Sequence, residues 1–169
     1  IWLSEQDGFA HLYRYDSNGS LKNQITKGNW RVREVVAVDE KSQQLWFAAS
    51  GMDPKQDPYF VHYYRINFDG SGLFALTQAP AHHQLSFSAD RQHYIDLYSR
   101  VDLPNVAELR RSSDGKLIRT LAKADISALT QAGFKVPQPF VAKGRDGKTD
   151  IWGLIVTPQN FKPDQQYPV

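Results

Sequence analysis

The sequence contains no cysteine, so disulfide bonds and thiolate-based sites are excluded. It has no apolar run near the roughly 18 residues that a membrane-spanning helix needs, and no signal peptide is recognisable. Neither sign of charge dominates, because 20 Lys and Arg stand against 18 Asp and Glu. A net charge of +2 is too small for the basic footprint of a nucleic-acid-binding protein. We therefore expect no nucleic-acid partner and no membrane span.

The composition is that of a folded β-rich protein. Hydrophobic residues make up 41% of the 169 positions and aromatic residues 12%, which suits the pleated surface of β-sheets. Ile1-Trp2-Leu3 reads as the middle of a strand with no initiator Met, and Tyr167-Pro168-Val169 reads as the start of another strand. We interpret the chain as an internal part of a longer polypeptide.

One turn motif recurs three times along the chain. Gly19, Gly70 and Gly115 each follow an Asn or Asp, and they lie 51 and 45 residues apart. In every copy a basic residue lies five positions before the glycine and an apolar residue six positions after it. Asx-Gly supplies the positive φ of a tight hairpin turn, so each copy is predicted to be a β-hairpin.

Further strands are expected before each hairpin. Each copy has one stretch in which the residues are apolar or alternate between apolar and polar: Ile1–Gln6, Gln44–Ser50 and His93–Arg100. A second precedes it in two copies: Val32–Asp39 and Gln84–Asp90. Four short strands per roughly 45–50 residues is the size of a propeller blade. We expect an all-β fold, a partial β-propeller of about three four-stranded antiparallel blades, the first lacking its innermost strand.

The repeat stops after Leu121, and a different organisation follows. Residues 125–133 predict a short helix with Asp125 as N-cap and Gly133 at its C-terminal end. A final hairpin is expected from Phe140–Lys143 and Asp150–Thr157. Its second strand is apolar enough to predict that both faces are covered. We place residues 1–136 in the propeller segment and residues 137–169 in a linker and first hairpin that lead into a further domain.

No residue is assigned to catalysis, to a cofactor or to a metal. The sequence has no G-x-S-x-G for a nucleophile elbow, and Ser71 lies within a hairpin turn. His82 and His83 would point to opposite faces of a strand, one packed and one in solvent, and neither has a partner at metal-ligand spacing. The turn acids are expected to bond their own backbone. Four aromatic residues are expected to pack between the sheets: Trp2, Trp46, Tyr94 and Tyr98.

Several strings in the sequence resemble the propeller of the dipeptidyl peptidase IV family. Ser4–Tyr13 is similar to that family's S-E-x-D-G-aromatic-x-H-L-Y run, and Ile25–Val32 to its I-T-K-G-x-W-x-V. Phe87–Asp90 and the following Tyr94–Ser99 are similar to the stretch before its last propeller hairpin. The Asp146–Asp150 turn resembles the beginning of its hydrolase domain. The resemblance covers essentially the whole chain, in order.

This resemblance implies a serine exopeptidase that releases dipeptides from free N-termini, with Pro or Ala second, and that is periplasmic or exported. It implies no cofactor. The family's catalytic triad is implied to lie beyond Val169 and its amine-binding glutamate pair before Ile1, so Glu34 and Glu40 are not assigned that role. The partners it implies are peptide substrates, and a homodimer for the parent enzyme. The chain alone is expected to be inactive and to self-associate.

Two other interpretations stay open at this stage. The blades could belong to a scaffold propeller that docks proteins, although the apolar strand at 151–156 favours a following α/β domain. A sibling peptidase, tripeptidyl or acylaminoacyl, would share the same blade pattern. A G-x-S-x-G in the residues that follow would decide between an enzyme and a scaffold.

Overall fold

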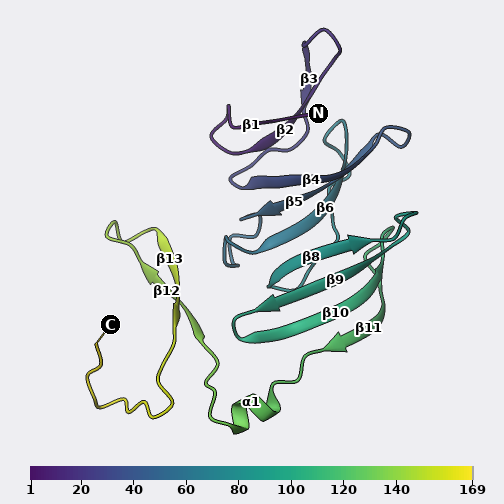
Figure 1. Cartoon of the computed structure of the whole chain (residues 1–169). Helices are drawn as coiled ribbons and strands as arrows, with labels where there is room; N and C mark the ends of the chain where they lie inside the picture. The colour runs from purple at the N-terminus through teal and green to yellow at the C-terminus, as the bar shows by residue number, and fades with distance from the viewer. Residues whose placement is uncertain (169) are drawn as a thin grey trace. The chain divides into compact units, whose positions relative to one another are not determined.

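The computed structural model describes residues 1–168 and is almost entirely antiparallel β-structure (Figure 1). The chain divides into two compact units. The first comprises residues 1–98 and 106–122, and the second comprises residues 99–105 and the chain from 123 onward. No described helix is long and apolar enough to cross a membrane.

The repeated part of the chain forms three successive sheets (Figure 1). In each sheet the strands lie in chain order, and every pair whose register is resolved is antiparallel. The first sheet contains β1 (Trp2–Ser4), β2 (His11–Tyr15) and β3 (Leu21–Gln24). The second contains β4 (Arg31–Asp39), β5 (Gln44–Ser50), β6 (Val61–Asn67) and β7 (Phe74–Ala75). The third contains β8 (His82–Phe87), β9 (His93–Arg100), β10 (Leu103–Arg111) and β11 (Leu117–Lys123). The predicted succession of one three-stranded and two four-stranded blades is confirmed.

The three predicted hairpin turns are also confirmed. Gly19, Gly70 and Gly115 have φ of 79°, 86° and 66°, the left-handed region that glycine adopts without strain. Acidic side chains shape these turns by accepting backbone N–H bonds two residues on: Asp16 from Asn18 at 2.9 Å and Asp69 from Ser71 at 2.8 Å. The turn role expected for Ser71 is therefore observed.

The apolar run of β5 is explained by burial on both of its faces. Leu45, Phe47 and Ala49 belong to a core cluster shared with the first sheet. Trp46 and Ala48 point the other way, into a second cluster that includes Tyr94 of the third sheet. Side chains alternate along a strand, so the central sheet contributes to both cores. Trp46 is 8% exposed, as predicted.

One expectation about aromatic packing is wrong. Trp2 is 66% exposed, so it does not pack between sheets. In the apolar strand β13, Ile151 and Leu154 are about half exposed. The covering on both faces that the sequence of this strand predicts depends on the further domain expected after it, and it stays a prediction. Tyr94 is buried as expected, and Tyr98 is partly exposed.

The second unit contains the helix α1 (Ser127–Gln131) and the hairpin of β12 (Gln138–Lys143) and β13 (Asp150–Ile155). Asp125 is not the N-cap, which is Ile126 without a side-chain cap bond. The Asp125 carboxylate instead accepts from the Ser127 N–H at 2.8 Å, an Asx turn that delays the helix. Gly133 follows the helix with φ 94°, as predicted. The proposed boundary near residue 137 stays a prediction.

Candidate functional site

The main cluster of buried polar side chains lies where the second sheet meets the third. It consists of one side chain from β6, one from β8, one from β9 and two from β10. Four of the five are less than 9% exposed, and the Arg110 side chain is 17% exposed. We call this cluster the polar seam; its members are His62, His83, Asp96, Glu108 and Arg110.

Both ring nitrogens of His83 are hydrogen-bonded. Its Nε2–H donates to the Ala79 carbonyl oxygen at 2.8 Å, because a carbonyl oxygen can only accept. Its Nδ1 shares a hydrogen bond of 2.7 Å with the Asp96 carboxyl group. His83 and Asp96, each 1% exposed, therefore form a buried, tightly coupled pair without net charge.

His62 is neutral in the folded chain. Its Nε2–H donates to Gln56 Oε1 at 2.9 Å. Its Nδ1 lies 3.2 Å from the Thr77 hydroxyl oxygen, which also accepts from the Tyr63 N–H at 3.0 Å. Burial, with the nearby His83, lowers the pKa of His62 from 6.5 to about 4. A neutral imidazole therefore packs against the ring of His83, with ring centroids 5.0 Å apart.

This arrangement repeats one blade earlier. His11 Nδ1 is hydrogen-bonded to the Thr26 hydroxyl at 3.1 Å, and Thr26 in turn accepts from the Leu12 N–H at 2.9 Å. Each histidine lies eight residues before its turn glycine and each threonine seven after it. The corresponding residues of the third repeat are Ala107 and Ala122, so both partners are absent together.

The carboxylates of the seam are held by Arg110. Its guanidinium donates to Glu108 Oε2 at 2.6 Å, and its Nε lies 3.9 Å from Asp96 Oδ2. The Tyr98 hydroxyl adds a bond to Glu108 Oε1 at 3.3 Å. Two basic and two acidic side chains thus meet in one network. Such a network is stabilising only when every member is satisfied, so it fixes how the strands that carry it are placed.

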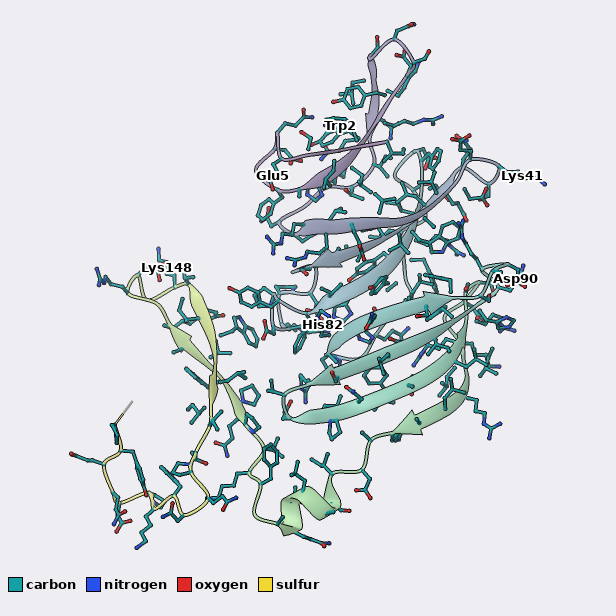
Figure 2. All side chains as sticks on the ribbon, viewed as in Figure 1. Trp2, Glu5, Lys41, His82, Asp90 and Lys148 are labelled. Carbon is teal, nitrogen blue, oxygen red and sulfur yellow. The ribbon has the colours of Figure 1, made fainter. Side chains whose placement is uncertain are left out.

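A pocket of about 480 Å³ opens beside the seam. His83 forms part of its wall, together with His82 and Gln84 of β8 and Tyr63 of β6. Figure 2 shows His82 at the start of β8. His82 is exposed and His83 buried, as expected for a pair of which one member packs and the other meets solvent.

The seam itself offers no nucleophile. Among residues 1–168 no serine hydroxyl is hydrogen-bonded to a histidine ring in the observed network. That part of the chain also holds no group of three His, Cys, Asp or Glu side chains placed to bind a metal. Sequence reasoning assigned no site residue, and it missed the seam as a structural unit. The sequence signal that points to His62 of the seam is the His–Thr pair that recurs around the first two turn glycines.

The order of the sheets and the buried seam between two of them define the chain as a segment of a β-propeller. The chain belongs to the dipeptidyl peptidase IV (DPP IV) N-terminal region family, whose sequence model matches residues 1–105.

Individual relatives agree with this family. The chain is 28% identical over 171 residues to dipeptidyl peptidase 4 of Arthroderma otae, and 29% identical over 173 residues to that of Trichophyton rubrum. Each alignment covers 99% of this chain and 21% of the relative. The chain therefore spans about a fifth of the length of these relatives.

Solved structures give the same result. Porphyromonas gingivalis dipeptidyl peptidase 4 matches 98% of this chain with a TM-score of 0.76 and 29% identity, over 23% of its own length. A second structure, from Bacteroides ovatus, matches 99% of this chain with a TM-score of 0.79 over 26% of its own length. At 24% identity this second match supports the fold alone.

Proposed function

We propose that this chain is a non-catalytic propeller segment of a serine exopeptidase that releases N-terminal Xaa-Pro and Xaa-Ala dipeptides. The observation that carries the proposal is the family match over residues 1–105, extended by relatives aligned along 99% of the chain. The enzyme acts outside the cytoplasm, in the periplasm or after export. It uses no cofactor, and its partners are peptide substrates.

The segment contributes shape to this enzyme. Three consecutive blades wall a cavity, and a wall of closely packed sheets admits only thin, unfolded peptide ends. Residues 137–169 form the linker and first hairpin of the hydrolase domain in this proposal. The exposed apolar side chains of β13 are then the surface on which that domain's sheet is completed.

The catalytic groups lie elsewhere in the longer polypeptide. This chain has no G-x-S-x-G, and both ring nitrogens of the buried His83 are engaged, one by a carboxyl group and one by a carbonyl oxygen. An imidazole with both nitrogens engaged has no free nitrogen to accept a proton from a serine, so it cannot act as the general base of a triad.

The test compares two proteins on three chromogenic substrates. The chain alone and the full product of its gene are assayed with a Gly-Pro, an Ala-Ala-Pro and an acetyl-alanyl substrate. We expect turnover of the dipeptidyl substrate by the full product only, abolished by a serine-directed inhibitor. Inhibitor-sensitive turnover by the chain alone contradicts its non-catalytic role. Preference for either of the other substrates identifies a tripeptidyl or acylaminoacyl enzyme instead.

A further inference from the structure

The pocket beside the polar seam contains two charges that have no partner among the residues that the structure describes. It is lined by Arg33 and Glu34 of β4, by His82 and Gln84 of β8, and by Tyr63 of β6. Arg33 and Glu34 are exposed, and neither takes part in an observed ion pair or side-chain hydrogen bond with another described residue. By contrast, the arginines at 100, 110 and 111 each bind a carboxylate.

A β-bulge brings the two unpaired charges to the same pocket. Along the β4–β5 ladder Val32 pairs with Ala49 and Glu34 pairs with Ala48, so Arg33 is an extra residue on β4. In a regular strand adjacent side chains point to opposite faces. A bulge breaks that alternation and redirects side chains, which is why bulges are frequent beside binding sites. Here it places a guanidinium and a carboxylate, adjacent in sequence, on one wall.

The pocket is also rich in groups that form hydrogen bonds. His82 and Gln84 are exposed at its edge, and an imidazole and a primary amide can each both donate and accept. The Tyr63 ring is buried deeper, and burial together with the Glu34 carboxylate raises the pKa of its hydroxyl. Glu34 and Tyr63 therefore line the same pocket, and the carboxylate acts on the tyrosine hydroxyl across it.

The charges determine which ligand fits. A simple anion would be attracted by Arg33 and repelled by Glu34. A simple cation would be attracted by Glu34 and repelled by Arg33. A ligand that carries both an ammonium and a carboxylate satisfies both, with the carboxylate on the planar guanidinium and the ammonium on Glu34. The volume of about 480 Å³ lies within the range of small-molecule sites, roughly 300–1,000 Å³.

We propose that this pocket binds a short peptide with both termini free, held by Arg33 at its carboxylate and by Glu34 at its ammonium. His82 and Gln84 contact the peptide group between the two termini. The proposal goes beyond the proposed function and does not depend on it, because binding requires no cleavage.

The experiment measures binding directly on the chain. Glycyl-proline is titrated into the ¹⁵N-labelled protein and followed by amide chemical shifts. Two capped analogues are titrated alongside: N-acetyl-glycyl-proline lacks the ammonium, and glycyl-proline amide lacks the carboxylate. We expect shifts centred on β4 and the start of β8, and affinity at least tenfold weaker for either analogue.

Two variants assign each terminus to its residue. Arg33→Ala is expected to bind glycyl-proline and its amide equally weakly, and Glu34→Ala to bind glycyl-proline and its acetylated form equally weakly. Arg119→Ala and Glu40→Ala remove exposed charges of the same signs elsewhere and should bind glycyl-proline as the unaltered chain does. Equal affinity for all three ligands, shifts outside the pocket, or unchanged binding in Arg33→Ala and Glu34→Ala would overturn the proposal.

Discussion

Replacing His62 by asparagine should remove a specific part of the pH dependence of stability. The folded protein holds His62 neutral with a pKa of about 4, whereas an unfolded histidine titrates near 6.5. Between these values the unfolded state binds a proton that the folded state does not, so stability falls as the pH falls. The groups around His62 are Thr77, Gln56, Asp53, His82 and His83.

The size of this effect follows from the two pKa values. At pH 5 His62 is protonated in the unfolded state and still neutral in the folded state. This difference lowers the free energy of unfolding by about 2 kcal/mol relative to pH 7. His62→Asn preserves an oxygen that can accept from Thr77 but cannot ionise in this range. Between pH 7 and pH 5 the free energy of unfolding should therefore fall by about 2 kcal/mol less in the variant than in the unaltered chain.

Urea unfolding followed by tryptophan fluorescence, at half-unit pH steps from 7.5 to 4.5, measures this difference. The matched control is His82→Asn, which replaces an exposed histidine one residue before the seam and should keep the slope of the unaltered chain. The reasoning is refuted if the curves of the unaltered chain and His62→Asn stay parallel. It is equally refuted if the chain gains stability relative to the variant as the pH falls, since His62 would then be charged in the fold.

Three further outcomes are expected. Trp46→Ala should cost about 3–5 kcal/mol in urea unfolding, because its ring fills the core between the second and third sheets, and an unchanged midpoint would mean that the ring is dispensable. Asp96→Asn should cost a similar amount, about 3–5 kcal/mol, by breaking the buried pair that Asp96 forms with His83. Asp150→Asn, at the exposed ion pair with Lys143, is its control and should leave the midpoint unchanged. Light scattering over a range of concentrations should show self-association, driven by the exposed apolar side chains of β11, and a monomer at every concentration would contradict this.

The sheets were predictable because their signals are local. Gln44–Ser50 and His93–Arg100 match β5 and β9 residue for residue, since each is a run of strand-forming side chains bounded by turn residues. The turn glycines were predictable for the same reason. Which side of a strand is covered is not a local property, and this is why Trp2 was wrongly expected to be buried.

The seam and the pocket were not predictable from local patterns. His83 and Asp96 are 13 residues apart and meet only when β8 pairs with β9. The His–Thr pair recurs in the first two copies of the repeat. Positions shared by all three copies do not include it, because the third copy has Ala107 and Ala122 in its place. The bulge at Arg33 depends on the register between β4 and β5, which no property of Arg33 itself determines.

The charge balance of the seam bears on the chemistry of the pocket next to it. The His83–Asp96 pair and the Arg110–Glu108 pair each carry no net charge, so the network is neutral as a whole. His83 lines the pocket, yet it is paired with Asp96 at 2.7 Å and adds no net charge there. The field that a ligand meets is therefore set by the two charges that the network leaves out, on the bulge of β4. A wall built on a neutral buried network, with one cation and one anion at its surface that pair with no other described residue, favours a ligand that is itself neutral overall and charged at both ends.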